Sequence, residues 1–539
     1  MCLPVGVKTR SRAERRALIG RVVRKSAAAV VTLLVLAPTS AFAHAEREVE
    51  FPPGPGRVPK YSNSGPSLVV CTQKSDDLIK KLSGKIRQRN EQLLERCDYR
   101  SIQTAIDNVE KKNSRILILP GTYRERKTLR KELPASCEEL KDVDILEYEE
   151  QKKCPTLQNI ITVFGDGKDD DVVCDNDLCG LQIEGTGAKP NHVKLEGAYR
   201  RLNVLRADRA DGIYLRNFTA QGSEFNAVYI LQTDGFVIDR LIGRWNDEYG
   251  FLTFASDHGL YKRCEAYING DSGVYPGAAA PHWGARTSIE IRRCKSHHNT
   301  LGYSGTAGDS TFVHHSKFYK NSVGIVTDSF FPDHPGLPQN SAKFTNNWIY
   351  SNNKDYYKNY ENGECDKPIK ERDYRGGVVC PAIPAPIGTG HLIAGGNSNI
   401  IGYNYIYNNW RDGATLFWVP AALREETDPA HSHDTSHNNH YIANIMGVSP
   451  TGEERPNGND FWWDEQGYGN CWLDNVGGTD GVSSDPATLP VCGENPSDNP
   501  AGNPAKTGLL APCAAWSREN HHPAGCDWME RPEKPESGG

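Results

Sequence analysis

The sequence has few methionines, no excess of positive charge, and no long apolar run beyond the one near its start. It contains 3 Met against 51 Gly and 33 Pro in 539 residues, which is typical of turn-rich β structure rather than of helix bundles. A net charge of −6 argues against a general nucleic-acid-binding protein. The sequence also lacks a CxxC pair, a Cys/His finger spacing, a phosphate-binding glycine loop and a nucleophile elbow. Zinc-finger and nucleotide-binding functions are therefore not expected.

The start of the chain is predicted to be an export signal. Several Arg and Lys residues between Arg10 and Lys25 precede a short apolar stretch at 27–37. Small residues at Ala41 and Ala43 then suit a cleavage site. We predict a signal peptide over 1–43 and a mature protein that is secreted, extracellular or at the cell surface. No later segment is apolar enough to span a membrane, which takes roughly 20 residues.

Cysteine usage agrees with export. The sequence has 15 cysteines; Cys2 lies in the predicted signal, which leaves 15 − 1 = 14. An even number in an exported protein indicates disulfides. We expect neighbours along the chain to pair, although a sequence does not fix connectivity. The expected pairs are Cys71/Cys97, Cys137/Cys154, Cys174/Cys179, Cys365/Cys380, Cys471/Cys492 and Cys513/Cys526.

An internal repeat is the main signal of the fold. Units of about 23 residues each begin with a turn residue that precedes a short strand, and an asparagine recurs at a fixed distance after it. A unit this short cannot bury an apolar face alone, so stacked coils are expected, with each strand pairing one coil away. The first residues of the units are Asp211, Asp234, Asp257, Thr287, Asp309, Asn340 and Asn397, and the asparagines are Asn246, Asn269, Asn299, Asn321, Asn352 and Asn409.

Equivalent residues should stack in ladders. Asparagines at one corner can then bond to the turn backbone above and below them. Cys264 and Cys294 share a repeat position, so we expect them in adjacent coils, either as a disulfide or as two buried thiols. By the same reasoning Asp257 is interpreted as a turn residue, although Asp257-His258 has the look of a catalytic pair.

Two motifs and the coils that follow them resemble the pectate-lyase-like superfamily. The motifs are Ser101-Ile-Gln-Thr-Ala-Ile106 and Ile116-Leu-Ile-Leu-Pro-Gly-Thr-Tyr123. The resemblance covers about 98–447 and implies a right-handed parallel β-helix. The superfamily includes pectin and alginate lyases, mannuronan C5-epimerases, pectin esterases and polygalacturonases. The chain looks most similar to exported bacterial right-handed β-helix repeat proteins.

The catalytic signatures of these enzymes are missing from the sequence. Gly390-His391-Leu392 stops short of the Gly-His-Gly element of polygalacturonases. Pro332-Asp-His-Pro335 is only superficially similar to the Asp-Pro-His-Glu element of alginate epimerases, and no Arg-x-Pro-x-x-Arg of pectate lyases occurs. No catalytic residue is therefore transferred from the family, because function lies in sites built on a fold.

The predicted fold class is all-β: a right-handed parallel β-helix (solenoid) with short N-terminal helices and a loop-rich, disulfide-stapled C-terminal region. We assign 44–97 to a flexible lead and an amphipathic capping helix from Ser75 to Arg96. The β-helix is assigned to 98–447, and a cysteine-containing C-terminal cap and tail to 448–539.

Insertions into the repeat indicate where a site lies. They occur at 276–286, 328–335, 354–396 and after Trp418, each assigned to the position that follows the second strand of a unit. Such insertions would form one wall of a groove that suits a polymer chain. The candidate residues on this wall are His282, Arg286, Asp328, Asp333 and His334, with Tyr275 pointing outward from the neighbouring strand.

These residues fit lyase or C5-epimerase chemistry on an acidic polysaccharide. His282 or His334 would remove the proton at C5, Tyr275 would act as the acid, and Arg286 would neutralise the uronate carboxylate. A hydrolase would instead use two carboxylates, Asp328 and Asp333. The main alternative is a non-catalytic carbohydrate-binding or cell-surface protein; a glycoside hydrolase or esterase is the least favoured.

A calcium ion is a further candidate, at the acidic turn of Asp166, Asp169, Asp170 and Asp171. A plain acidic surface turn is the alternative. We expect a polysaccharide or cell-surface glycan as the partner, no nucleic acid, and a monomer.

Overall fold

The computed structural model describes residues 49–125, 134–143, 145–166, 172–330, 334–424, 426, 428–432, 436–494, 496–499 and 502–536. The predicted signal peptide, 1–43, lies outside the described residues. None of the helices described is long and apolar enough to cross a membrane.

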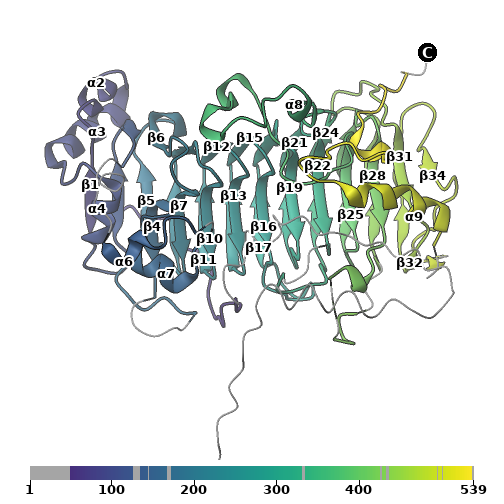
Figure 1. The fold of residues 1–539 in the computed structure, drawn as a ribbon, viewed down its shortest axis with the longest axis horizontal. Helices are drawn as coiled ribbons and strands as arrows, with labels where there is room; N and C mark the ends of the chain where they lie inside the picture. Colours follow the sequence, from purple (N-terminus) through teal and green to yellow (C-terminus); the bar gives the residue numbers. More distant parts are fainter. Residues whose placement is uncertain are drawn as a thin grey trace, which may run out of the picture. The chain divides into compact units, whose positions relative to one another are not determined.

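Three long parallel sheets build a solenoid whose coils follow one another in sequence order (Figure 1). Each complete coil gives one strand to sheet A, then one to sheet B, then one to sheet C. Strands β8, β9 and β10 form one such coil and pair in register with β11, β12 and β13 of the next. The predicted all-β parallel solenoid is thereby confirmed.

Sheet A has twelve strands: β1 (Ser67–Val70), β2 (Arg115–Ile118), β5 (Gln182–Gly185), β8 (Ile213–Arg216), β11 (Asp234–Asp239), β14 (Asp257–Lys262), β17 (Ile289–Arg292), β20 (Phe312–His314), β23 (Lys343–Thr345), β26 (Ile400–Gly402), β29 (His440–Ile442) and β33 (Cys471–Leu473). Sheet B has ten: β3 (Gly121–Tyr123), β6 (Val193–Glu196), β9 (Thr219–Gln221), β12 (Ile242–Asn246), β15 (Glu265–Asn269), β18 (Lys295–His297), β21 (Lys317–Tyr319), β24 (Trp348–Tyr350), β27 (Tyr405–Tyr407) and β30 (Ile445–Met446). Sheet C has eleven: β4 (Asn159–Phe164), β7 (Asn203–Asp208), β10 (Asn226–Leu231), β13 (Tyr249–Phe254), β16 (Ser272–Gly277), β19 (Leu301–Thr306), β22 (Val323–Asp328), β25 (Thr389–Ala394), β28 (Asp412–Phe417), β31 (Asn459–Trp463) and β34 (Ser484–Asp485). A small antiparallel pair joins β32 (Gly467–Tyr468) to β35 (Asp498–Asn499).

Alternation along each strand separates the core from the outer faces. In β10, Val228 and Ile230 belong to the central core of the solenoid. Tyr229 and Leu231 belong to a second apolar cluster on the outer face of sheet C. Successive side chains of a strand point to opposite faces, so one short strand supplies both clusters.

The predicted asparagine ladder is present at the corner between sheets B and C. Asn246, Asn269, Asn299 and Asn321 are fully buried. The side-chain amide of each donates to the side-chain oxygen of the next, at 2.8, 2.8 and 3.2 Å. Two further ladders, Asn347 to Asn475 and Asn399 to Asn470, occupy the other corners.

We expect the Asn299→Ala variant to lose roughly 3 kcal/mol of unfolding free energy. The side-chain oxygen of Asn299 accepts from the backbone N–H of Asn269 at 3.1 Å and from its amide group at 2.8 Å. Both donors would become buried and unsatisfied. Chemical denaturation measures the loss, and Asn108→Ala, at an exposed helix end, is the control. Equal stability of the two variants would contradict this role.

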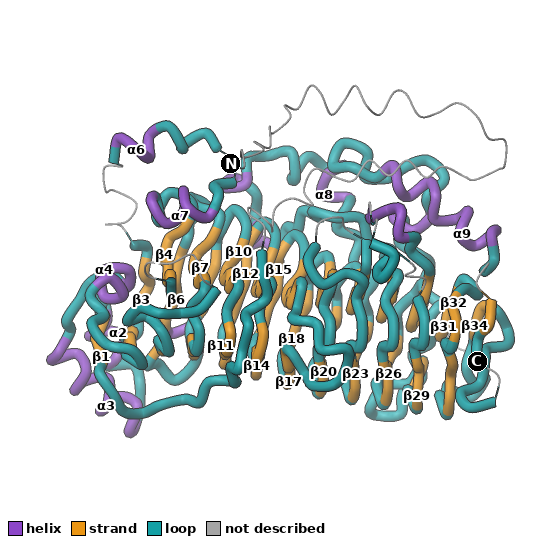
Figure 2. Tube along the Cα trace, turned by 90° about the horizontal axis from the view of Figure 1, so that it is seen from below, coloured by secondary structure: helices purple, strands orange, loops and turns teal. Residues whose placement is uncertain are grey.

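The α-helices of the described residues are α2 (Ser75–Ile79), α3 (Gly84–Arg96), α4 (Ile102–Asp107), α6 (Ala135–Glu138), α7 (Tyr148–Lys153), α8 (Lys358–Glu361) and α9 (Pro504–Leu510). Helices α7, α8 and α9 lie along one side of the stacked strands (Figure 2). The predicted single helix from Ser75 to Arg96 is divided in two. Gly84 begins the second helix with φ at +57°, a left-handed backbone conformation that interrupts a continuous helix.

The solenoid begins earlier and ends later than the assigned range of 98–447. Strand β1 pairs with β2 as the first strand of sheet A, and β31, β33 and β34 extend the sheets after Met446. The described part of the segment assigned as a flexible lead is packed against the coils. Tyr61 donates to Glu184 at 2.8 Å, and Phe51 contacts the outer cluster of sheet C.

The C-terminal segment folds back along sheet C instead of only closing the end of the coils. Trp528 packs on Phe417 and Trp462, with ring centroids 5.4 and 6.0 Å apart. Arg518 reaches Glu248 in an earlier coil, at 3.6 Å.

Within the part of the chain that the structure describes, seven disulfides join Cys71–Cys97, Cys137–Cys154, Cys174–Cys179, Cys264–Cys294, Cys365–Cys380, Cys471–Cys492 and Cys513–Cys526. The Cys264–Cys294 bond links adjacent coils. Of the two alternatives that the sequence left open for this pair, the structure has the disulfide and not two buried thiols.

Candidate functional site

Insertions emerge at two corners of the solenoid, not at one. The segments 278–288, 329–342 and 418–439 connect sheet C to sheet A. The segment 351–388 instead connects β24 of sheet B to β25 of sheet C, so its assignment to the same wall was wrong. The strands of sheet B are as short as two residues, and the sequence repeat does not reveal them as separate strands.

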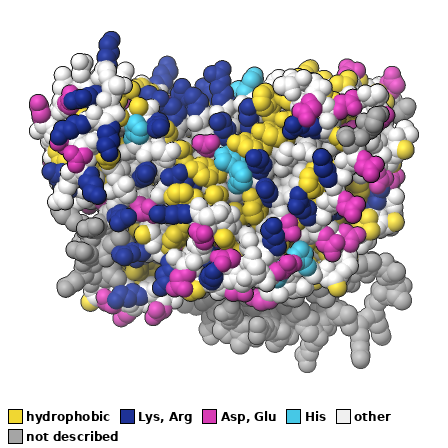
Figure 3. Space-filling model, turned by 90° about the horizontal axis from the view of Figure 1, so that it is seen from above, with side chains coloured by type: hydrophobic (Ala, Val, Ile, Leu, Met, Phe, Trp, Pro, Cys, Tyr) yellow, Lys and Arg dark blue, Asp and Glu magenta, His cyan; other side chains and the backbone are white. Residues whose placement is uncertain are grey.

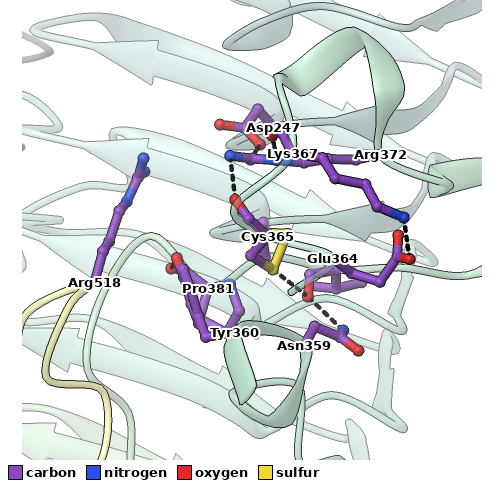
Figure 4. The surroundings of a disulfide bond; sticks show 12 residues. Asp247, Asn359, Tyr360, Glu364, Cys365, Lys367, Arg372, Pro381 and Arg518 are labelled. Atoms are coloured by element: carbon purple, nitrogen blue, oxygen red, sulfur yellow. Dashed lines mark hydrogen bonds and ion pairs between the residues drawn. A yellow bond between two sulfur atoms is a disulfide. The ribbon is translucent and has the colours of Figure 1, made fainter. Parts of the chain in front are cut away.

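The 351–388 insertion is anchored on an earlier coil (Figure 4). The guanidinium of Arg372 donates to Asp247 and to the carbonyl of Cys365, the latter at 2.7 Å. The hydroxyl of Tyr374 also donates to Asp247. Tyr360 donates to the carbonyl of Pro381 at 2.6 Å. These contacts, with the Cys365–Cys380 disulfide, hold the loop at the corner between sheets B and C.

Two of the predicted residues meet on Asp257. The ring Nε2 of His282 lies 3.0 Å from Asp257 Oδ2, and Arg286 binds both carboxylate oxygens through Nη1 and Nη2. His258 lies beside them, with Nδ1 at 3.7 Å from Asp257 and 2.6 Å from Asp234. We call Asp234, Asp257, His258, His282 and Arg286 the Asp257 cluster.

The fold explains this meeting. Asp257 opens β14, and its Oδ1 accepts the backbone N–H of His258 at 2.7 Å, which is the predicted turn role. The 278–288 insertion follows β16 and returns to the same corner, where Asp309 accepts the backbone N–H groups of His282 and Trp283 at 3.0 and 3.3 Å. One coil therefore supplies the carboxylate, and the insertion that begins the next coil supplies the imidazole and the guanidinium.

The ionised carboxylate of Asp257 selects the tautomer of the His282 imidazole that binds it. Burial acts to raise the pKa of Asp257, but hydrogen bonds from Arg286 and the His258 backbone outweigh it, so this pKa lies below the usual value. An ionised carboxylate only accepts hydrogen bonds. Nε2 of His282 must therefore carry the hydrogen, and Nδ1 of the neutral ring is left with a lone pair.

Three other predicted residues, Tyr275, Asp328 and His334, form a second group on the outer face of sheet C. Tyr275 lies on β16, and its hydroxyl is 3.1 Å from Nε2 of His334. Asp328, at the end of β22, accepts from the hydroxyl of Thr306 at 2.8 Å. We call Tyr275, Thr306, Asp328 and His334 the Tyr275 cluster. Asp333 lies outside the described residues.

The two clusters differ in exposure. In the Tyr275 cluster, Tyr275, Asp328 and His334 are 3%, 5% and 8% exposed. In the Asp257 cluster, the side chains of His282 and Arg286 are 22% and 39% exposed. Burial raises the pKa of Asp328 to about 6 and that of nearby Asp271 to about 7. The Asp257 cluster is thus the more accessible, and the Tyr275 cluster contains buried acidic groups.

Sequence reasoning missed Asp257 and His258. The repeat shows that Asp257 is equivalent to Asp211 and Asp234, but it does not show what an insertion of the next coil brings to it. One signal was available. His258 stands where Gly212 and Gly235 stand in the preceding coils, and its φ is +47°. The replacement of the glycine of the earlier units by a residue that can transfer a proton would have favoured a role beyond the turn.

Metal-ligating groups are found in the Asp257 cluster and elsewhere. Asp234, Asp257 and His258 present ligand atoms within 4.8 Å of one another, as do Glu361, His521 and His522. The guanidinium of Arg286 already neutralises Asp257. Of the acidic turn predicted to bind calcium, only Asp166 is described, and it pairs with Lys152 and Arg209 at 3.3 and 3.1 Å.

Comparison with known proteins identifies the fold. Residues 226–365 match a family model described as a right handed beta helix region. The chain is a right-handed parallel β-helix protein. This confirms the fold implied by the resemblance to the pectate-lyase-like superfamily. No curated protein matches the sequence.

Solved structures with this fold are similar at low identity. A periplasmic alginate epimerase shares 12% identity over 69% of each chain, with a TM-score of 0.36. A mannuronan C-5 epimerase A-module from Azotobacter vinelandii shares 12% identity over 70% of this chain and 94% of its own, with a TM-score of 0.32. A pectate lyase shares 11% identity over 73% and 76%, with a TM-score of 0.28. Their activities are not assigned to this β-helix protein on these grounds.

Proposed function

We propose that this β-helix protein is an exported lyase or C5-epimerase of a uronate-containing acidic polysaccharide, with the Asp257 cluster as its active site. One observation carries the proposal: the carboxylate of Asp257 binds the imidazole of His282 and the guanidinium of Arg286 at the same time. A base held by a carboxylate and a cation beside it are the groups that proton removal next to a carboxylate requires.

In this mechanism, N–H groups of Arg286 that do not bind Asp257 donate hydrogen bonds to the uronate carboxylate and so acidify the proton at C5. Nδ1 of His282 removes that proton, and Asp257 stabilises the imidazolium that forms. In a lyase, the electron pair from the C5–H bond forms the C4–C5 double bond, and the C4–O4 bond breaks. His258 then protonates the departing oxygen. In an epimerase, a proton returns to C5 from the opposite face.

The exposure of the two clusters favours His258 over Tyr275 as the acid. The side chain of His258 is 19% exposed, whereas Tyr275 is buried and hydrogen-bonded to His334. Asp328 is buried and accepts from Thr306, which does not favour its use as one of the two carboxylates of a hydrolase. Export is part of the proposal, and the disulfides among the 14 remaining cysteines support it, because disulfides persist in oxidising compartments.

The test is to incubate the purified protein with mannuronan, guluronan and polygalacturonate, with and without calcium. We expect either ultraviolet absorbance from unsaturated uronate, which marks β-elimination, or altered uronate stereochemistry in proton NMR spectra. Neither change with any of these polymers would overturn the proposal for them. A non-catalytic carbohydrate-binding protein would then be the function to pursue.

A further inference from the structure

A row of stacked aromatic rings runs along the outer face of sheet B, away from the Asp257 cluster. Its members are Tyr267, His297, Tyr319, Tyr350 and Tyr407, one from each of five successive strands. Neighbouring ring centroids are 5.1, 4.8, 5.1 and 5.0 Å apart. The ring planes are nearly parallel, with angles of 6°, 26°, 5° and 3°. We call these five residues the aromatic row.

Stacking determines which parts of the aromatic rings a ligand can contact. The faces of the inner rings are covered by their neighbours, so their edges and hydroxyl groups remain for binding. Tyr319 and Tyr350 are half-buried, and neither hydroxyl forms a hydrogen bond with a described residue. The hydroxyl of Tyr267 accepts from Arg244 at 2.5 Å. The row thus presents polar groups at steps of one coil.

Lysines flank the aromatic row on both sides. Lys295 and Lys317 lie two residues before His297 and Tyr319 on the same strands, and Lys320 and Lys354 follow at the corner with sheet C. The first three form no ion pair with a described residue. Burial and Lys295 lower the pKa of Lys317, and burial and Lys320 lower the pKa of Lys354. Lys295 and Lys317 are neighbours in register on β18 and β21, so their ammonium groups lie close together. Lys295 also neighbours Glu265 on β15, and the ammonium of Lys317 lies over the ring of Trp348, 3.4 Å from its centroid.

The charge pattern is visible on this face. The labels of β12, β15, β21 and β24 lie along the upper edge in Figure 1. Seen from that side, Lys and Arg side chains gather around hydrophobic and histidine side chains (Figure 3). Two carboxylates lie near the row. Glu265 is engaged by His297 at 3.4 Å. Burial and nearby Glu453 raise the pKa of Tyr407, and Glu453 pairs with Arg455 at 2.8 Å.

We propose that the outer face of sheet B, from β15 to β27, is a second binding surface for an anionic polysaccharide, which lies along the solenoid axis. The lysines pair with carboxylates of the chain, and the tyrosine edges meet its hydroxyl groups. Strands of a sheet repeat about every 4.8 Å, which is similar to the step of an extended pyranose chain. The choice of a uronate polymer as the ligand rests on the proposed function, whereas the anionic character follows from the lysines.

The test measures the affinity of the full chain for a sized oligoguluronate and a sized oligogalacturonate by titration calorimetry. For the stronger ligand, we expect the Lys295→Gln/Lys317→Gln/Lys320→Gln variant to bind about tenfold more weakly at low salt. The difference should shrink as salt screens the charges. The Tyr319→Phe/Tyr350→Phe variant, which keeps the stacked rings, should lose a few-fold.

The matched control is Lys85→Gln/Lys111→Gln/Lys112→Gln, which removes the same charge from exposed positions near the N-terminal helices. Affinity of the Lys295 triple variant equal to that of this control would overturn the proposal. So would equal binding of the unmodified protein to neutral dextran, or tighter binding to a single-stranded oligonucleotide. The His282→Ala variant separates the two proposals, because it should keep polymer binding at sheet B even where no product forms.

Discussion

The His282→Ala variant is expected to form product from the preferred uronate polymer about 10²- to 10⁴-fold more slowly, the usual contribution of a positioned base. His282 has Nε2 fixed on Asp257 at 3.0 Å, which leaves Nδ1 to take the proton. Alanine removes this base but leaves the strands of the coil intact. Initial rates by ultraviolet absorbance or proton NMR measure the change, and a thermal melt checks that the variant is folded.

His314→Ala is the matched control. Its ring Nε2 lies 3.0 Å from Glu290, which also accepts from Arg292 at 2.9 Å, and its side chain is 16% exposed. This group resembles the one on Asp257, but it lies on strands β17 and β20 of sheet A and not on an insertion. We expect the rate of this control variant to be unchanged. If His282→Ala retained the rate of the unmodified protein, His282 would not be the base.

Arg286 gives a second view of the same site. Arg286→Lys keeps the positive charge but loses the two parallel hydrogen bonds to Asp257, since a lysine ammonium does not match a carboxylate in this way. A role in orienting His282 predicts a lower kcat with little change in KM. A role in binding the uronate carboxylate alone predicts a higher KM with little change in kcat.

The fold could be predicted from the repeat because the length of its units and the recurring asparagines both indicate stacked coils. Asn246, Asn269 and Asn299 share one position in successive units, and only stacked coils let their amide groups bond to one another. The same periodicity concealed the site. It correctly marked Asp257 as a turn residue, but the contacts of Asp257 with His282 and Arg286 come from an irregular insertion whose path no period describes.

Burial also separates residues that the sequence grouped together. His282, Arg286 and His334 were expected on one wall, with Tyr275 on the neighbouring strand. His334 is instead packed with Tyr275 on sheet C, while His282 and Arg286 remain partly exposed. The segments that pack on sheet C, such as the one containing Trp528, are distant in sequence. No local pattern reveals which strand face they cover.

We expect the Asp271→Asn variant to be more stable than the unmodified protein at pH 8. Asp271 is buried and accepts from the hydroxyl of Tyr249 at 2.9 Å. Burial, with Asp328 nearby, raises its pKa from 3.8 to about 7. A group whose pKa is raised on folding stabilises the folded state fully below its unfolded pKa. That contribution is lost as pH rises through about 7.

The unfolding free energy of the unmodified protein should therefore fall between about pH 4 and pH 7, with Asp271 contributing up to roughly 4 kcal/mol. An amide stays neutral and still accepts from Tyr249, so Asp271→Asn removes this part of the slope. Chemical denaturation across the pH range measures it, with the exposed Asp77→Asn as control. The slope that remains is expected to include Asp328, whose pKa is raised to about 6. An unchanged slope in Asp271→Asn would show that Asp271 does not titrate as a buried acid.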